Sequence, residues 1–339
     1  MKRTMQAAVF EREGVLALQQ VSVPTLGKDD DVILRVEAAS ICGSDLKILE
    51  VPPAHPAKKG VIMGHEYLGT VVEAGDAVTA LAVGDRVVVE PNIPCGECPY
   101  CKENVFHMCA NLETLGETLD GGFAEYNLAP AGHLHKVPKG TPDEEAVFTE
   151  PLTCALGAFQ KINVKPADTV IIFGAGPLGL LFLELFISSG ARTMVAEPAT
   201  DRRRVAEQCG AEVVVDPMKA KLGEVVNDFS SLGVHFAVDT VGSVMSVAIP
   251  LLRRYGTLIL FGVNEHSESK IKQYEITRNN LRVLGSFIGV GDFPKAIEIL
   301  HSKKIDVRNL ISAQMPLNEI STGVELLRQR KAIKVIISP

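Results

Sequence analysis

Tryptophan is absent from this 339-residue chain, and aromatic residues make up only 5% of it. Stacking of nucleic-acid bases on aromatic side chains is therefore not expected as the main activity. No basic run stands out either: the chain has 34 lysines and arginines and 41 aspartates and glutamates, which gives a net charge of −7. This balance argues against a nucleic-acid partner or an anionic membrane surface. With 46% hydrophobic and 22% charged residues, the composition is that of a globular chain, and its length predicts about two domains.

We expect no export signal, because the first residues lead directly into a strand-like pattern without an apolar core. Residues 169–188 are almost wholly apolar over about 20 positions, the length of a membrane-spanning helix. This stretch contains Glu184 and is interrupted by a glycine-rich break, so a buried strand followed by a buried helix explains it better. We therefore expect a soluble, cytoplasmic protein that does not act on a membrane.

Two kinds of pattern divide the chain. Short β-rich runs bounded by Gly, Pro and Asp, as in an all-β barrel or sandwich, occupy 6–10, 15–23, 32–39, 67–73, 86–90 and 123–128. Apolar strands then alternate with helical segments, which is typical of βαβ units and a parallel sheet; the segments are 169–173, 177–189, 193–196, 201–208, 212–215, 235–238, 244–254 and 257–261. The tail from Phe293 predicts a helix, a loop, a second helix at 317–330 and a last strand at 333–337. The pattern alone does not assign this tail to either domain.

Four of the seven cysteines form one local cluster, at Cys95, Cys98, Cys101 and Cys109. Four thiolates at this spacing can surround one tetrahedral Zn²⁺ ion. Paired disulfides are the alternative, but they fit poorly in a chain without an export signal, since cytosolic thiols stay reduced. We expect a structural zinc site, because closed four-cysteine sites usually have no catalytic role.

A second set of metal-binding side chains is dispersed along the chain: Cys42, His65, Glu66 and Glu150. A thiolate, an imidazole and carboxylates can hold zinc and leave one position open for water or substrate. Taken alone, a single cysteine is more often a small buried residue, and a single histidine is more often a hydrogen-bonded group. The run Gly-His-Glu-x2-Gly-x5-Gly at 64–75 favours the metal site over these alternatives.

A glycine-rich turn follows the apolar strand at 169–173 and begins an apolar helix; it contains Gly174, Gly176, Pro177 and Gly179. These glycines permit a tight turn and close approach of a pyrophosphate to the helix N-terminus, where free N–H groups favour anions. Glu197 follows Gly179 by 18 residues, where an acid can bind both ribose hydroxyls of NAD and repel a 2′-phosphate. We therefore expect NAD rather than NADP. This choice stays open because three arginines follow: Arg202, Arg203 and Arg204. They either form a solvated first helical turn or contact a phosphate or the adenine.

These three motifs, in this order, resemble those of the zinc-dependent medium-chain dehydrogenases, and the resemblance covers essentially the whole chain. The chain looks most like the polyol branch (sorbitol, galactitol and threonine-type dehydrogenases), because Glu150-Pro-Leu stands where simple alcohol dehydrogenases offer a cysteine ligand. The resemblance implies an α/β protein with a GroES-like β-rich catalytic domain at 1–154 and a Rossmann NAD-binding domain, a doubly wound parallel sheet, at 155–286. Residues 287–339 would return to the catalytic domain. A homodimer or homotetramer, with the active site in the cleft between the domains, is implied too.

The resemblance also supplies roles for single residues. Cys42, His65 and one or both of Glu66 and Glu150 would hold a catalytic zinc, the second of two per chain, and Ser44 would take part in a proton relay. Leu178 (by its backbone), Glu197 and Arg202 would meet the adenosine half of NAD. The segments that match those lining the nicotinamide half contain Val241, Phe261, Gly262, Val263, Ser286, Phe287 and Ile288.

The chain departs from the family pattern near the substrate. Lys47 stands where members often carry the last histidine of the proton relay, and it is either an exit group for the proton or a plain surface charge. Ile48 and Ile288 stand where sorbitol dehydrogenases place a tyrosine and an arginine. These changes bear on sorbitol as the substrate and leave the expected reaction unchanged.

The motifs and the resemblance together imply a zinc-dependent oxidoreductase that transfers hydride between a secondary alcohol (a polyol, sugar alcohol or related sugar acid) and NAD. One alternative is an L-threonine-like amino-alcohol dehydrogenase, and another is a catalytically silent NAD-binding sensor. The intact ligand set argues against a sensor, which needs no open zinc, and disfavours the zinc-free quinone reductase branch. Cys154 and Cys209 remain outside these motifs, and a buried structural role is expected for both.

Overall fold

The computed structural model describes residues 3–289 and 291–339. The packing divides them into two compact units. The first contains residues 3–153, 291–303 and 311–339, and the second contains residues 154–289 and 304–310. The expectation that all of 287–339 returns to the first unit therefore differs from the structure in two stretches, 287–289 and 304–310.

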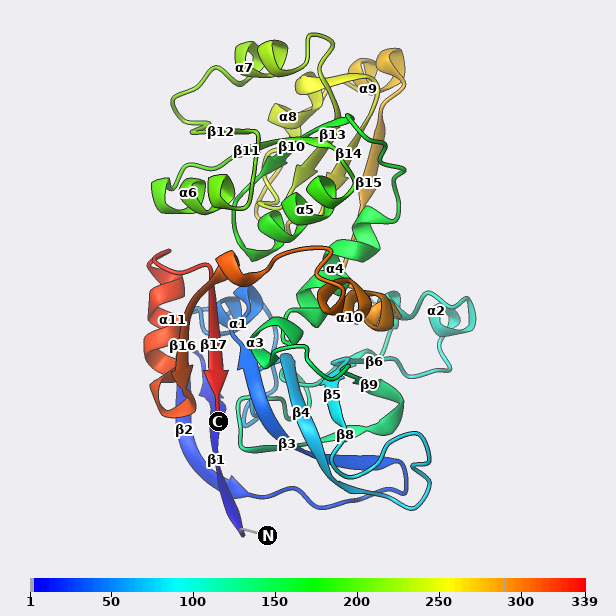
Figure 1. The fold of residues 1–339 in the computed structure, drawn as a ribbon, viewed down its shortest axis with the longest axis vertical. Helices are drawn as coiled ribbons and strands as arrows, with labels where there is room; N and C mark the ends of the chain where they lie inside the picture. Colours follow the sequence, from blue (N-terminus) through cyan, green and yellow to red (C-terminus); the bar gives the residue numbers. More distant parts are fainter. Residues whose placement is uncertain (1–2, 290) are drawn as a thin grey trace. The chain divides into compact units, whose positions relative to one another are not determined.

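The second unit is a six-stranded parallel sheet with strand order β12-β11-β10-β13-β14-β15, the doubly wound order. Helices α5 and α6 lie on one face, and α7, α8 and α9 lie on the other (Figure 1). Its strands are β10 (Thr169–Phe173), β11 (Arg192–Ala196), β12 (Val213–Val215), β13 (Val234–Asp239), β14 (Leu252–Leu260) and β15 (Arg282–Gly285). Its helices are α5 (Pro177–Ser188), α6 (Thr200–Gln208), α7 (Leu222–Phe229), α8 (Met245–Ala248) and α9 (Gln273–Asn279), with 3-10 turns η3 (Ile249–Leu251) and η4 (Arg308–Leu310).

The helix expected at 244–254 is shorter than the pattern suggests. It consists of α8 and η3, and β14 already begins at Leu252. The first part of β14 carries exposed side chains, and its pairing with β13 is irregular between Leu252 and Thr257, so this part lacks the apolar pattern of a buried strand. Helices α7 and α9 fall outside the expected helical segments.

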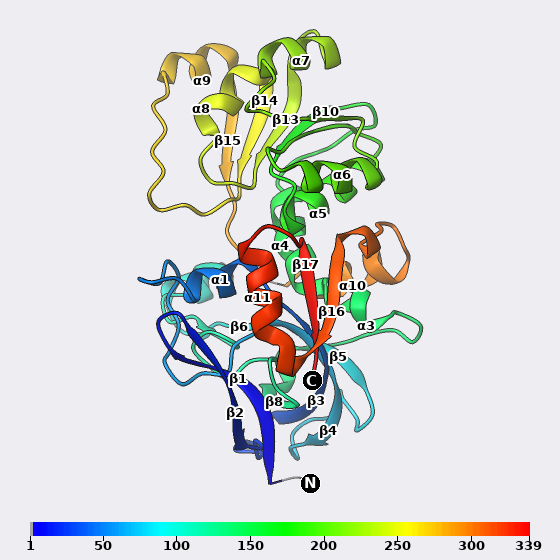
Figure 2. The same cartoon turned by 90° about the vertical axis from the view of Figure 1, so that its left-hand side faces the viewer.

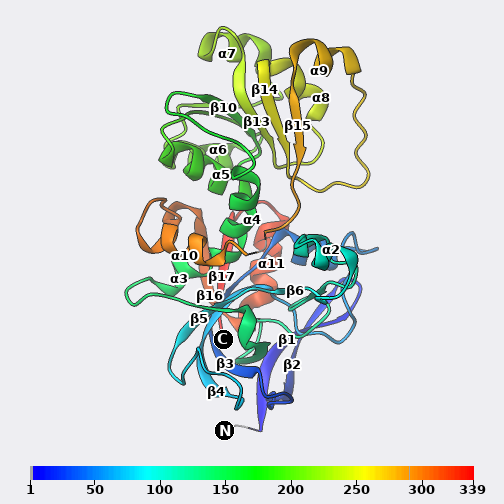
Figure 3. The ribbon, with the colours of Figure 1, turned by 90° about the vertical axis from the view of Figure 1, so that its right-hand side faces the viewer.

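The first unit is built on a seven-stranded sheet with the order β16-β17-β3-β4-β5-β9, in which β8 also pairs with β3. Helix α11 packs on β16 and β17 (Figure 2), and α10 packs on α3 (Figure 3). The strands are β1 (Thr4–Arg12), β2 (Val15–Ser22), β3 (Asp31–Ser40), β4 (Glu66–Ala74), β5 (Arg86–Val89), β6 (Asn92–Ile93), β7 (Glu113–Thr114), β8 (Tyr126–Pro130), β9 (Leu134–Lys136), β16 (Ile311–Pro316) and β17 (Lys334–Ser338). The helices are α1 (Gly43–Ile48), α2 (Pro99–Lys102), α3 (Asp143–Ala146), α10 (Phe293–His301) and α11 (Ile320–Arg328), with 3-10 turns η1 (Phe106–Met108), η2 (Ala131–His133) and η5 (Leu317–Glu319); α4 (Thr149–Phe159) follows α3.

Several strands of the first unit differ from the sequence expectation, and the short strands β6, β7 and β9 fall outside the expected runs. Strand β16 occupies part of the expected loop and pairs in parallel with β17. Strand β8 begins at Tyr126 rather than at Phe123, because the backbone of Phe123 and Ala124 pairs with other segments: Phe123 N–H donates to the carbonyl oxygen of Met63, and Ala124 forms an isolated bridge with Ala7. The expected α/β class, a β-rich part together with a doubly wound parallel sheet, is confirmed.

Helix α5, which forms most of the apolar stretch noted in the sequence, has only 12 residues. Across residues 3–289 and 291–339, no helix combines the length and the apolar character needed to cross a bilayer.

Three glycines bring three backbone segments together next to His65. Gly64 and Gly116 both adopt φ of 93°, in the left-handed region that favours glycine. A Cβ added at Gly121 would lie 2.2 Å from the carbonyl oxygen of Gly64 and 2.5 Å from the Cα of Gly116. The N–H of Gly122 donates to the same carbonyl at 2.7 Å. The backbone that precedes His65 is therefore fixed by contacts that only glycine permits.

Replacing Gly121 by Ala is expected to lower the free energy of unfolding by about 2 kcal/mol or more, because the new methyl group meets backbone on two sides. Gly132→Ala is the matched control, since its added Cβ meets nothing within 4 Å. Urea denaturation of the two variants measures the difference. Equal midpoints for the two variants would contradict the crowding at Gly121.

Candidate functional site

The pairing of β3 with β4 brings the dispersed ligand candidates together. Ser40, the last residue of β3, is the register partner of Glu66, the first residue of β4. Cys42 is the N-cap of α1, and its N–H donates to Asp45 Oδ2 at 2.8 Å, which holds the start of that helix. One ligand atom from each of Cys42, His65 and Glu66 lies within 4.8 Å of the others. This distance suits a shared metal ion.

Polar groups surround both ring nitrogens of His65. Ser44 Oγ lies 3.4 Å from Nε2, and Asp45 Oδ1 lies 3.7 Å from Nδ1. Burial raises the pKa of Asp45 to about 6. Burial acts to lower the pKa of His65, but the neighbouring Cys42 and Asp45 outweigh it and raise this pKa above its usual value. Within the described part of the chain, Asp45 Oδ1 and His65 Nδ1 are buried without a hydrogen-bond partner, as expected for a site arranged around a cation.

Glu66 is held by two groups from other strands. Ser40 Oγ and Lys334 Nζ both donate to its carboxylate, and Lys334 is only 1% exposed. Burial opposes ionisation of Glu66, but Lys334, His65 and Ser40 together outweigh this effect and lower the pKa of the carboxyl. The charge of Glu66 is therefore already balanced inside the protein.

Glu150 is buried in the first turn of α4. It is not among the three residues whose ligand atoms meet within 4.8 Å in the described structure. Its carboxylate acts electrostatically on both His65 and Lys334, so it belongs to the same charged surroundings.

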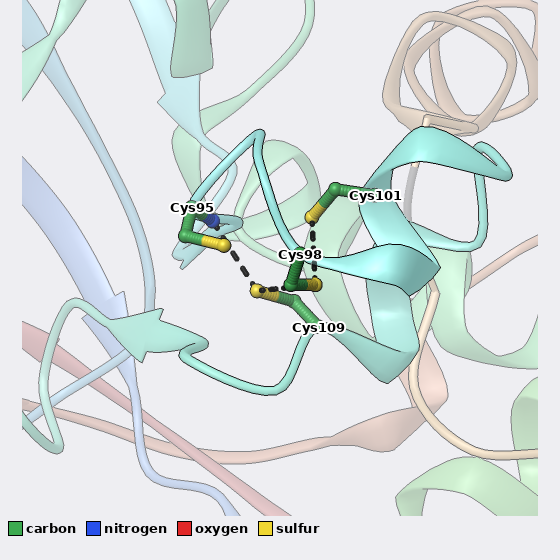
Figure 4. Close-up of side chains that lie close together, drawn as sticks. All are labelled: Cys95, Cys98, Cys101 and Cys109. Carbon is green, nitrogen blue, oxygen red and sulfur yellow. Dashed lines mark hydrogen bonds between the residues drawn. The ribbon is translucent and has the colours of Figure 1, made fainter.

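Cys95, Cys98, Cys101 and Cys109 converge in one loop, with their sulfurs within 4.8 Å of one another (Figure 4). Cys98 Sγ lies 3.5 Å from Cys101 Sγ and 3.9 Å from Cys109 Sγ, and all four thiols are free. Backbone N–H groups of Ala110 and Cys101 lower the pKa of Cys98 to about 6. Free thiols gathered at this spacing, one of them readily ionised, are a donor set for tetrahedral zinc rather than for disulfides.

In the second unit, the glycine-rich turn lies between the end of β10 and the start of α5. Gly174 has φ of 97°, and a Cβ added at Gly179 would lie 2.0 Å from the Gly174 carbonyl oxygen. Gly176 is the N-cap of α5, and Pro177 and Leu178 begin its first turn. The helix N-terminus is thus open to a close anionic ligand such as a pyrophosphate.

Glu197 follows the end of β11 and is 4% exposed. Its two oxygens accept the N–H groups of Ala175 and Ala199, each at 2.8 Å, which fixes the carboxylate beside the glycine-rich turn. Arg202 NH1 lies 3.9 Å from the Cβ position of Gly176, whereas Arg203 donates to the carbonyl oxygens of Glu197 and Pro198. Of these two arginines, Arg202 is therefore the one that lies against the turn.

The remaining expected cofactor residues follow the carboxyl ends of three neighbouring strands, where doubly wound sheets bind ligands. Asp239 at the end of β13 accepts the N–H groups of Val241 and Gly242 and shapes that turn. Val241, Val263 and Phe287 are exposed, whereas Phe261 and Ser286 are buried. A Cβ added at Gly262 would lie 2.3 Å from Gly242 N, so the two turns approach closely at this position.

Ile288 has φ of 35°, in the left-handed region of the backbone. The structure brings the following residues to one edge of the sheet: Val241, Phe261, Gly262, Val263, Ser286, Phe287 and Ile288.

Sequence reasoning missed three residues that surround the candidate metal ligands: Ser40, Asp45 and Lys334. The sequence contained a pattern from which two of these three residues could have been identified. Lys334 is a single charge in the apolar run Ala-Ile-Lys-Val-Ile-Ile, and Asp45 stands three residues after Cys42, where a side chain can cap a helix. Lys47 is half-buried in the last turn of α1, and its carbonyl oxygen accepts the N–H of Ala54 at 3.0 Å.

Two protein families match parts of this chain. Residues 28–139 match the alcohol dehydrogenase GroES-like domain, and residues 177–302 match the zinc-binding dehydrogenase family. The four-cysteine loop lies within the first of these matches.

Relatives match over the full length. The D-arabitol-phosphate dehydrogenase of Enterococcus avium is 33% identical over 99% of this chain and 98% of its own length. The sorbitol dehydrogenase of Halalkalibacterium halodurans is 30% identical over 99% of both chains. A zinc-binding dehydrogenase from Sinorhizobium meliloti 1021, solved bound to NADP, has a TM-score of 0.94 at 32% identity over the whole of both chains. The expected GroES-like and Rossmann domains are thereby confirmed. The chain belongs to the zinc-dependent medium-chain dehydrogenase family, and its relatives include members of the polyol branch.

Proposed function

We propose that this protein is an NAD-dependent polyol dehydrogenase, which transfers hydride between a secondary alcohol and the nicotinamide ring. The observation that carries this proposal is the meeting of Cys42 and His65 beside two buried carboxylates, Glu66 and Glu150, in a chain whose full-length relatives are named for polyols. The substrate class is a polyol, a sugar alcohol, its phosphate ester, or a related sugar acid. We expect no nucleic-acid or membrane partner, and an assembly of two or four identical chains.

Two zinc ions per chain follow from the two donor sets. Cys95, Cys98, Cys101 and Cys109 form a closed set for a structural ion, whereas Cys42, His65 and a carboxylate leave room for substrate. Bound zinc supplies Lewis acidity that makes an alcohol hydroxyl more acidic, and bound nicotinamide coenzyme supplies the hydride acceptor.

The residues around His65 orient it and move a proton. Asp45 faces His65 Nδ1 and holds the ring, as carboxylates behind metal-binding histidines do. Ser44 Oγ, 3.4 Å from His65 Nε2, accepts the proton of the substrate alcohol and passes it towards solvent. Lys47 belongs to the same short helix, α1, and is the candidate exit group.

The preference for NAD rests on Glu197. Its carboxylate is fixed by two backbone N–H groups, so its negative charge cannot turn away from a 2′-phosphate. The solved Sinorhizobium relative is bound to NADP, so the preference of this protein between NAD and NADP has to be measured. An amino-alcohol dehydrogenase and a silent NAD-binding sensor are the other outcomes of the same experiments.

The decisive experiment is a substrate panel with the zinc-loaded protein. Polyols, polyol phosphates, aldonates and amino alcohols are offered with NAD or NADP, and coenzyme reduction is followed at 340 nm. We expect turnover of at least one polyol or polyol phosphate with NAD, at rates typical of enzymes, about 1–1,000 per second. Turnover of L-threonine alone supports the amino-alcohol reading, and coenzyme binding without turnover of any compound supports the sensor.

Glu150→Gln is expected to remove about one zinc ion per chain and to abolish turnover, whereas Glu66→Gln retains that zinc. The reason is that the Glu66 carboxylate already accepts hydrogen bonds from Ser40 and from the Lys334 ammonium, which balances its charge. Glu150 is therefore the stronger carboxylate ligand for zinc. Metal analysis of the two purified variants measures this difference directly. Zinc loss in Glu66→Gln with full zinc in Glu150→Gln would reverse the assignment.

Cys98→Ser is expected to remove the structural zinc and lower the melting temperature by roughly 5 °C or more, because a loop without its metal loses its cross-links. Cys154→Ala is the control, since Cys154 is a buried cysteine outside both donor sets. Calorimetry and zinc content are measured on both. An unchanged melting curve and a full zinc content in Cys98→Ser would rule out the structural site.

Glu197→Ala is expected to weaken NAD binding about tenfold and to reduce the preference of the enzyme for NAD over NADP, because both a ribose acceptor and a fixed negative charge are lost. Glu207→Ala, on the exposed side of α6, is the control. The kcat/KM ratio for the two coenzymes measures the preference. An unchanged ratio would show that Glu197 has no part in coenzyme choice.

A further inference from the structure

Glu184 and Cys209, two residues that neither the coenzyme site nor the metal sites use, meet in the second unit. Glu184 is 8% exposed in the otherwise apolar helix α5. Its Oε2 accepts the N–H of Asp306 at 3.1 Å, and its side chain is also hydrogen-bonded to Cys209. Burial raises the pKa of Glu184 and raises that of Cys209 to about 12, so the thiol stays protonated and donates. A buried carboxylate in an apolar helix thus has a partner from a distant part of the chain.

That partner is the segment Lys304–Leu310, here named the strap, which packs with the second unit. Ile305, Val307 and Leu310 of the strap are buried, and Asn309 Nδ2 lies 3.5 Å from the carbonyl oxygen of Gln208. The strap is therefore fixed to the second unit by apolar side chains and by hydrogen bonds.

Both ends of the strap continue into the first unit. Before it, Lys303 forms an ion pair with Glu145, and His301 Nδ1 lies 2.9 Å from Thr141 Oγ1. After it, Ile311 begins β16, which pairs with β17. Seven residues thus leave one unit, attach to the other, and return.

The attachment points lie on the two helices that begin at the proposed coenzyme site. Helix α5 begins at the glycine-rich turn and carries Glu184, and α6 begins three residues after Glu197 and ends beside Cys209. A helix is a rigid element with a hydrogen bond at each residue, so a shift at its N-terminus reaches its other end.

We propose that Glu184 is a positioning residue, which fastens the strap to the coenzyme-binding unit. Because the strap continues at both ends into the metal-binding unit, this contact couples coenzyme binding to the backbone segments of that unit. This inference rests on the coenzyme site of the proposed function. The carboxylate does not touch the reacting atoms; it acts by holding the Asp306 N–H, and through it the strap, against α5.

Hydrogen exchange of the full-length, zinc-loaded protein tests the contact directly, with peptides that cover 304–310. We expect Glu184→Leu to exchange about tenfold faster there than the native protein, because a hydrogen bond to a charged acceptor is lost. Glu184→Gln keeps an acceptor oxygen at the same place and is expected to restore slow exchange. Glu224→Leu, on the exposed face of α7, is the matched control and leaves the strap unchanged.

Coupling is tested by repeating the exchange with NADH. We expect NADH to slow exchange in the strap of the native protein and of Glu184→Gln, and this slowing to disappear in Glu184→Leu. We also expect kcat to fall several-fold in Glu184→Leu with little change in the KM for the alcohol. A merely structural role would lower the melting temperature without altering the response to NADH.

The outcomes separate this inference from the proposed function. If native protein binds NADH and turns over a polyol but its strap does not respond, the coupling is overturned and the function stands. If native protein does not bind NADH, the proposed function fails, while exchange without coenzyme still decides whether Glu184 holds the strap. Should Glu184→Leu not fold, the response of the native protein and of Glu184→Gln to NADH decides the coupling.

Discussion

Buried negative charge around His65 is the constraint on which the metal site depends. The thiol of Cys42 and the carboxyl groups of Asp45, Glu66 and Glu150 surround one imidazole. Among residues 3–289 and 291–339, Lys334 is the only buried lysine, and its ammonium group faces this negative charge. Burial of unpaired charge is costly, so either protons or a cation must balance this group. The pKa of Asp45, which burial raises to about 6, shows the cost of holding a carboxylate charged in this place. A divalent ion, which Cys42 and His65 are placed to hold, would supply the missing positive charge.

The two candidate sites of this protein are positioned by two different kinds of local structure. In the first unit, the antiparallel pairing of β3 and β4 places the ends of two strands beside each other, and glycines allow a third segment to approach. In the second unit, the carboxyl ends of parallel strands form one edge, where turns rather than strands carry the side chains. The candidate coenzyme residues therefore come from many short segments, whereas the candidate metal ligands come from few.

Two buried charged residues in apolar elements of this chain each contact a distant segment. Lys334 in β17 balances Glu66, and Glu184 in α5 accepts from the strap. Each is a single charge in an apolar run, and each has a partner more than a hundred residues away. Such residues mark long-range contacts, because a charge is tolerated in a core only when a partner reaches it.

The sequence by itself determined what depends on short spacing. The four cysteines, the glycine-rich turn with Glu197, and most strands of both units were predicted, because neighbours within about 20 residues define their geometry. Only the tertiary structure decided the rest: the salt bridge of Glu66 with Lys334, the separation of Glu150 from the three converging ligand atoms, strand β16, and the attachment of the strap. These features join residues far apart in the chain, and no local pattern states which distant partner a buried charge or an edge strand will find.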